Sequence, residues 1–202
     1  MKVLVMYHPD FASKGKFERK LTRIFSESSE YKVFYFEDNQ NLIHDYFSSD
    51  LIFKLDPDLL TDPYNLGLTH AVVFDSALKP EFTTIYETLA SQIPVRYIKD
   101  KITFVSNKDR GEHFDVYCGR GTLWGNPYAI GADGDRDEVI RKFKYDFDRN
   151  FLKGGEDFKE KLKAHKGKIL GCHCKPYPCH ADVLARLLNE LDDADYSHFI
   201  VA

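Results

Sequence analysis

The sequence predicts an α/β protein with a Rossmann-like parallel sheet, followed by a second, smaller α/β domain. Short apolar strands alternate with amphipathic helices, and polar loops follow the strands. The composition, 43% hydrophobic and 30% charged, is that of a globular protein. Strands that alternate with helices pair in parallel through right-handed crossovers. We therefore expect a Rossmann-like domain over residues 1–108 and a smaller α/β domain over 109–202.

The first half of the chain contains four predicted strands and three predicted helices. A helix that begins near Phe17 has apolar residues at helical spacing and basic residues on its other side, whereas 31–36 alternates with a period of two. Residues 102–105 are expected to extend the sheet or to form a hairpin with their neighbour. The predicted strands are 1–7, 31–36, 71–74 and 95–98, and the predicted helices are 17–25, 41–47 and 80–89.

The second half begins after a polar, glycine-containing stretch, 106–112, which is the best candidate for a linker. Its elements are a strand at 115–118, a glycine-rich loop at 119–128, helices over about 136–152 and 158–164, a strand at 168–170 and a helix from 183 on.

Composition and charge narrow the class of protein. No apolar run approaches the roughly 18 to 20 residues of a membrane span, and the first residues lack a signal-peptide pattern. We therefore expect a cytoplasmic protein with no membrane partner. The net charge of −4 provides no whole-chain attraction for nucleic acid, which leaves only a local contact open. The oligomeric state does not follow from the sequence.

The stretch 171–180 holds three of the four cysteines and two of the eight histidines, between a predicted strand and a predicted helix. Ligands of open α/β sheets bind where strand ends and helix starts face one crevice. A helix start also lowers the pKa of a nearby thiol and favours anions. Cys179 is therefore a candidate nucleophile, and His180 is a candidate acid/base or phosphate contact.

Two other interpretations of this stretch stay open. Zinc takes thiolate and imidazole ligands, and the set here would be Cys172, Cys174 and Cys179 with His180 or His173. The spacing disfavours zinc, and we expect Cys172 and Cys174 to point to opposite faces if the strand continues through them. We therefore expect no cofactor, with zinc as the minority alternative. In the third interpretation the cysteines only fill a tight space between the strand, the loop and the helix.

The loop 119–128 is the second candidate site. Arg120 offers a planar fork for phosphate, and Gly119 and Gly121 allow close approach of the backbone. Asn126 can bind an amide or a base edge, and Trp124 can stack on a ring, unless this single tryptophan belongs to the core.

Asp75 and Ser76 follow a central strand of the first half, a position where doubly wound sheets bind nucleotides. They are further candidate ligand-binding residues, with solvated loop positions as the alternative. Neither a dinucleotide fingerprint nor a P-loop is present.

Two resemblances extend this interpretation. The motifs Gly119-Arg120-Gly121-Thr122-x-Trp124-Gly125-Asn126-Pro127 and Cys172-x-Cys174-x-Pro176-x-Pro178-Cys179-His180 resemble an uncharacterised domain family of phages and bacteria, which implies one shared site and no particular reaction. The first half, with Val72-Val73-Phe74-Asp75 before a helix and Ile93-Pro94-Val95 after it, is similar to Rossmann-like folds of the SLOG and nucleoside deoxyribosyltransferase groups.

We therefore predict a protein that acts on a nucleotide or nucleobase, an enzyme of the hydrolase or transferase class. Arg120 and the helix start at Cys179 would hold phosphate, Asn126 and Trp124 the base or sugar, and Cys179 or His180 would perform the chemistry. The alternative is a non-catalytic nucleotide-sequestering or adaptor protein, phage-encoded, with a Cys/His loop that is structural, with or without zinc.

Overall fold

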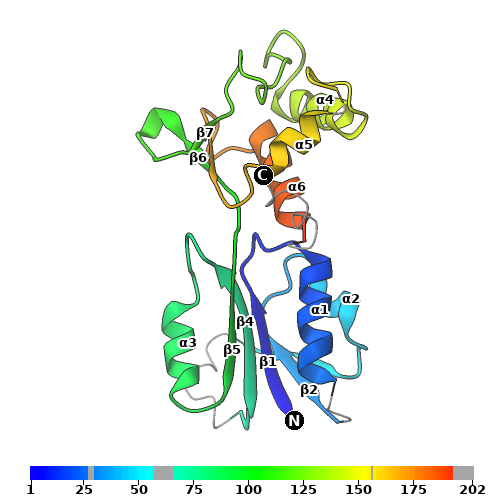
Figure 1. Ribbon diagram of the computed structural model, residues 1–202, viewed down its shortest axis with the longest axis vertical. Helices are drawn as coiled ribbons and strands as arrows, with labels where there is room; N and C mark the ends of the chain where they lie inside the picture. The colour runs from blue at the N-terminus through cyan, green and yellow to red at the C-terminus, as the bar shows by residue number, and fades with distance from the viewer. Residues whose placement is uncertain (27–29, 57–65, 156, 193–202) are drawn as a thin grey trace, which may run out of the picture. The chain divides into compact units, whose positions relative to one another are not determined.

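The computed structural model describes residues 1–26, 30–56, 66–155 and 157–192 (Figure 1). Backbone contacts divide the described chain into a unit of Met1–Asp100, joined by residues 190–192, and a unit of Lys101–Asn189. Each unit holds its own sheet, and every strand pair is parallel. The predicted α/β class is confirmed, and the domain boundary between residues 108 and 109 stays a prediction.

The first sheet has five strands in the order β3-β2-β1-β4-β5. The chain moves outward from β1 to β3 and then returns to the other side of β1, so the switch point of the sheet lies between β1 and β4. The short edge strand β3 lies where the sequence indicated no strand. The strands are β1 (Lys2–Tyr7), β2 (Lys32–Tyr35), β3 (Ile52–Lys54), β4 (His70–Ser76) and β5 (Val95–Asp100).

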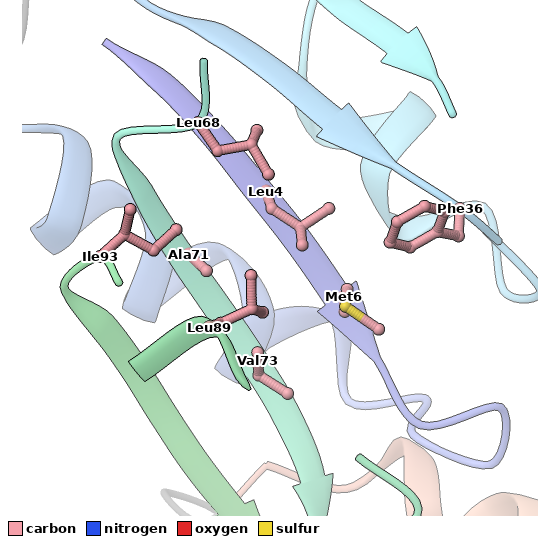
Figure 2. Packing of buried hydrophobic residues seen from close by; sticks show 8 residues of the cluster. All are labelled: Leu4, Met6, Phe36, Leu68, Ala71, Val73, Leu89 and Ile93. Atoms are coloured by element: carbon pink, nitrogen blue, oxygen red, sulfur yellow. The ribbon is translucent and has the colours of Figure 1, made fainter. Parts of the chain in front are cut away.

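Helices cover both faces of this sheet, with α1 (Lys14–Phe25) and α2 (Leu42–Tyr46) on one side and α3 (Thr83–Ala90) on the other (Figure 1). Alternate residues of each strand point to opposite faces. On the α1 side the ring of Phe17 packs 5.1 Å from the ring of Phe74. The cluster on the α3 side contains Leu4, Met6, Ala71 and Val73 from the strands, with Leu89 and Ile93 (Figure 2).

The second sheet has three strands in the order β6-β8-β7, namely β6 (Phe104–Asn107), β8 (Ile169–Cys172) and β7 (Val116–Tyr117). The register pairs Asn107 with Cys172 and Tyr117 with Gly171, so the carboxyl ends of all three strands meet at one edge. The helices of this unit are α4 (Arg136–Asp148), α5 (Asp157–Lys163) and α6 (His180–Glu190). No helix of the described ranges is long and apolar enough to span a bilayer.

Two predictions about the segment between the sheets are wrong. Residues 102–105 neither extend the first sheet nor form a hairpin, because β6 pairs with β8, which lies far along the chain. The stretch 106–112 is not a free linker, since Ser106 and Asn107 are buried in β6 and Lys108–Arg110 form a 3-10 helix. Their polarity misled the sequence interpretation, because Ser106 donates to the backbone oxygen of His113 (2.9 Å) and is thereby satisfied while buried.

Candidate functional site

A cavity of about 300 Å³ opens at the carboxyl-terminal edge of the second sheet. Both sequence motifs line it, and this size lies at the lower end of the range for small-molecule pockets. Its wall includes Gly119, Arg120 and Asn126 from the glycine loop, Arg136 from the start of α4, and Cys172, His173, Cys174, Cys179 and His180 from the Cys/His loop.

The glycine loop is folded tightly by its own backbone. A Cβ on Gly125 would lie 2.4 Å from the backbone oxygen of Gly119, so only glycine permits this approach, and Gly121 has a φ of +92°. The buried Asn126 donates from its side-chain amide to the backbone oxygen of Val139 (3.1 Å) and accepts from the backbone N–H of Tyr128 (2.9 Å). Asn126 therefore ties the loop to α4, and its predicted contact with a base would use only the remaining N–H and lone pair.

Two arginines reach the cavity from different elements. Arg120 is exposed, and its guanidinium has no hydrogen bond or ion pair to any described residue. Arg136 donates to the backbone oxygen of Pro178 (3.2 Å), and its guanidinium carbon lies 5.3 Å from the centre of the Tyr177 ring. Sequence reasoning missed Arg136. Its position in the first turn of a helix was the available signal. The macrodipole favours anions there, such as the capping Asp135, so a cation at this place is unexpected.

The Cys/His loop leaves the extended conformation directly after Cys172, the last residue of β8. The side-chain amide of Asn107 donates to the backbone oxygens of Lys175 and His173, which holds the loop against β6. The backbone N–H of Cys179 donates to the carboxylate of Asp182 (2.8 Å), in the manner of a capping box at the start of α6.

This turn brings three sulfur atoms together. The Sγ atoms of Cys172, Cys174 and Cys179 all lie within 4.8 Å of one another. The expectation that Cys172 and Cys174 point to opposite faces is therefore wrong, because residues two positions apart lie on the same face of a strand. The turn after Cys172 brings Cys179 to the same place. His180, the fourth member of the predicted zinc set, is not part of this group of mutually close atoms.

Two of these cysteines, Cys172 and Cys179, differ strongly in the pKa of their thiols. The Cys179 thiol donates a hydrogen bond to Cys172, which lowers the pKa of Cys172 to about 5 against the effect of burial, with further help from nearby His180. The same hydrogen bond, followed by burial, raises the pKa of Cys179. The helix start was expected to lower the pKa of Cys179, but the hydrogen bond to Cys172 and burial raise it, and the lowered pKa belongs to Cys172.

His180 is held in one orientation. Its side chain is buried, and Nε2–H donates to the backbone oxygen of Cys118 at 2.8 Å. The ring of Phe143 packs against it at 5.1 Å between centroids. Burial also raises the pKa of Cys118 to about 12, so that cysteine is an inert thiol.

A second imidazole at the cavity has partners on both nitrogens. His173 Nδ1 lies 2.7 Å from a carboxylate oxygen of Asp109, and its Nε2 lies 2.6 Å from the hydroxyl of Tyr117. A carboxylate on one side fixes the tautomer, so the array can pass a proton between the imidazole and the phenol. Sequence reasoning did not assemble it, because Asp109 lay in the supposed linker and lies 64 residues from His173.

Two predicted ligand residues lie away from this cavity. Trp124 packs edge-on against Phe158 (5.0 Å between ring centroids) and against His165 (5.1 Å), and it is absent from the cavity wall. Gly121 lines a neighbouring hollow together with Arg120. Their roles in ligand binding stay predictions.

Asp75 and Ser76 are the last residues of β4 rather than loop residues. The buried carboxylate of Asp75 accepts hydrogen bonds from the backbone N–H groups of Ser76 (2.7 Å), Glu81 (3.0 Å) and Phe82 (2.9 Å) and from the Tyr97 hydroxyl (2.5 Å). Burial alone would raise the pKa of Asp75, but these hydrogen bonds hold it below its usual value. The Ser76 hydroxyl accepts from two backbone N–H groups of the same turn, so both side chains are built into the approach to α3.

Other polar groups near the switch point are also paired within the unit. Lys16 and Asp100 form a buried ion pair at 2.6 Å, and His8 Nε2 lies 3.3 Å from a carboxylate oxygen of Glu81. The buried hydroxyl of Ser13, at the N-cap position of α1, has no hydrogen-bond partner among the described residues.

Two family models match different parts of the chain. Residues 1–106 match the model of the minimal SLOG domain, and residues 104–190 match a domain of unknown function (DUF4326). The "Uncharacterized 12.4 kDa protein in nrdA-td intergenic region" of Enterobacteria phage T4 is 45% identical over 93 residues, which are 46% of this chain and 82% of the phage protein. No solved structure matches the chain significantly. The resemblances to a SLOG fold and to an uncharacterised phage and bacterial domain family are thus confirmed.

Proposed function

The chain belongs to the minimal SLOG domain family, and from that premise we propose that it binds a nucleotide or nucleobase in the cavity of the Lys101–Asn189 unit and acts on it as a hydrolase or transferase. A SLOG domain suggests a nucleotide-related function. The observation that supports this place for the ligand is one cavity lined by both the glycine loop and the Cys/His loop.

Phosphate binding in this proposal rests on the arginines. The Arg120 guanidinium is exposed at the cavity without a partner among the described residues, and Arg136 adds a second positive charge on the same wall. The start of α6 contributes less than the sequence suggested. The backbone N–H of Cys179 is already bonded to Asp182, and that of Ala181 is bonded to the Cys179 sulfur.

The base would lie against the apolar part of the wall, which includes Ile130, Val139 and Ile140. For the chemical step, Cys179 or His180 remains the proposed catalytic residue. The imidazole of His173, oriented by Asp109, adds a candidate general acid or base on the same wall.

Equilibrium binding of a panel of nucleotides, nucleosides and nucleobases, followed by analysis of products, tests the proposal. Arg120→Ala should weaken binding of phosphorylated ligands by about tenfold or more, because a charge-assisted hydrogen bond is lost, and should leave nucleobase binding unchanged. Arg141→Ala is the matched control, since Arg141 is an exposed arginine of α4 that pairs with Glu138 outside the cavity wall. Failure of the whole panel to bind, or equal affinity of both variants, would contradict the proposal.

A binding protein without catalysis is the second candidate. It is favoured by the two buried groups, Asn126 and His180, that are tied to backbone oxygens of the unit itself and so form a rigid wall. Tight binding of a nucleotide that is recovered unchanged after long incubation would select this alternative over an enzyme.

A further inference from the structure

The three clustered cysteines have the kind and spacing of side-chain atoms that bind a thiophilic metal ion. Their sulfurs lie within 4.8 Å of one another, all three are free thiols, and all three line the cavity. In tetrahedral zinc sites the Zn–S distance is about 2.3 Å, which separates neighbouring sulfurs by about 3.8 Å. Only a small contraction of the cluster would therefore be needed for a single ion.

The loop that carries the sulfurs is already held in place. Cys172 ends β8, Asn107 fixes the loop to β6, and Asp182 caps the start of α6. Such preorganisation is what a metal site requires of its supporting residues. Soft thiolate ligands select zinc or another thiophilic ion over magnesium or calcium, which prefer oxygen.

A positive group contacts the cluster and would offset part of the charge of bound thiolates. The guanidinium of Arg136 donates a hydrogen bond to the Cys174 sulfur. Each thiol that binds the ion would lose its proton to solvent.

We propose that Cys172, Cys174 and Cys179 bind a single thiophilic metal ion, zinc in the first instance, with the fourth coordination position open to the cavity. His180 does not take that position, because it stands outside the group of mutually close ligand atoms and its Nε2–H is bonded to the backbone oxygen of Cys118. Three protein ligands with one open position are the pattern of zinc sites that meet a substrate, whereas structural sites are closed. This site does not depend on the proposed nucleotide chemistry. With the ion bound, Cys179 is a ligand rather than a nucleophile.

The first test measures metal in the full chain, purified under reducing conditions without chelators. We expect about one zinc per chain by elemental analysis. After removal of zinc, titration with Co²⁺ should produce the thiolate-to-cobalt and d–d absorption of a tetrahedral site. Cys172→Ser, Cys174→Ser and Cys179→Ser should each weaken Co²⁺ binding at least tenfold. Cys118→Ser is the matched control, a buried cysteine outside the cluster, and should bind Co²⁺ as the wild type does.

Thiol mapping keeps the test decisive if the serine variants fail to fold. In wild-type protein, Zn²⁺ should protect Cys172, Cys174 and Cys179 from alkylation, as located by mass spectrometry, and a chelator should remove that protection. No Co²⁺ absorption, or equal alkylation of the three thiols with and without Zn²⁺, would overturn the metal site.

The open position is tested separately. Added imidazole should shift the Co²⁺ spectrum, and His180→Asn should retain both the affinity for Co²⁺ and its spectrum. A closed site would give a wild-type Co²⁺ spectrum that does not change with imidazole, together with loss of Co²⁺ binding in His180→Asn. That result would overturn this part of the proposal. Nucleotide binding is measured independently in both the zinc-loaded and the zinc-free protein, so failure of the proposed function is distinguishable from failure of the metal site.

Discussion

The switch point of the first sheet and the cavity of the second sheet both have polar residues at or after strand ends. The two places differ in whether the chain itself provides hydrogen-bond partners for those residues. Asp75 lies at the end of a strand and Arg120 shortly after one, and both were predicted to bind a ligand. The Asp75 carboxylate is buried under four hydrogen bonds from its own unit, whereas the Arg120 guanidinium is exposed with no partner among the described residues. A polar residue at a strand end is therefore available to a ligand to the extent that the chain leaves its hydrogen bonds unsatisfied.

The difference has a simple origin in the two loops. After β4 the chain turns back into α3, and the N–H groups of this turn converge on Asp75. After β7 the glycine loop closes on itself through Gly125 and leaves Arg120 outside its own hydrogen bonds. Substitutions in the two regions should therefore separate loss of stability from loss of binding.

The largest effect is expected for Asp75→Ala. It leaves several buried donors without an acceptor, at about 1–3 kcal/mol for each unsatisfied group, so we expect the free energy of unfolding to fall by about 3–4 kcal/mol. Urea denaturation followed by far-ultraviolet circular dichroism measures this loss. The fluorescence of Trp124, the single tryptophan, reports on the other unit and should be little changed. A loss below about 1 kcal/mol would show that the carboxylate is not the structural centre of this turn.

Trp124→Ala should have the next largest effect. The half-buried ring packs on Phe158 and His165, and its removal should lower the free energy of unfolding by about 2–3 kcal/mol, less than for a fully buried tryptophan. Trp124→Phe should restore most of this stability. Calorimetry of both variants checks the result. Lost ligand affinity in Trp124→Phe with full stability would instead support the predicted stacking of Trp124 on the ligand.

Arg120→Ala should behave in the opposite way. Because the side chain is exposed and unpaired, the free energy of unfolding should change by less than about 0.5 kcal/mol, while affinity for phosphorylated ligands falls. Thermal unfolding of this variant beside Arg141→Ala provides the comparison. A clear loss of stability in Arg120→Ala but not in Arg141→Ala would show that Arg120, like Asp75, stabilises the fold.

The smallest expected effect is a change in acid sensitivity. The folded-state pKa of Asp75 is lowered, so its ionisation stabilises the fold above the unfolded value of about 3.9, and this contribution is lost as the pH falls through the folded pKa. Asp75→Asn should therefore show a shallower loss of stability than the wild type below about pH 4. Urea midpoints measured from pH 7 down to pH 3 test this slope, and identical slopes in the two proteins would assign the acid sensitivity to other carboxylates.

Much of the fold was predictable because it is encoded locally. The period of two in 31–36 and the helical spacing after Phe17 reflect side chains that face one core, and the structure places β2 and α1 there. The pairing of Phe104 with Ile169 has no such signal, because it joins residues 65 positions apart, and the local pattern of β6 fits either sheet. The edge strand β3 was missed for a related reason, since its residues are partly or fully exposed and carry little periodicity.

The candidate site shows the same boundary between local and non-local information. Local chemistry alone identified the two loops, because arginine, glycine, cysteine and histidine at strand ends are unusual in combination. The approach of Cys179 to Cys172 and Cys174 required the turn after β8, and the lowered pKa of Cys172 required Cys179 as its hydrogen-bond donor. The contribution of Arg136 and the pairing of Asp109 with His173 likewise depend on segments brought together by the fold.

The amino-acid sequence by itself determined the class of fold, the elements with strong periodicity and the residue types available for chemistry, since these depend on side chains within one turn or one strand. Only the tertiary structure decided which polar groups are satisfied by the chain and which face a cavity. That outcome depends on hydrogen bonds and burial between segments far apart in the sequence, as the contrast between Asp75 and Arg120 shows.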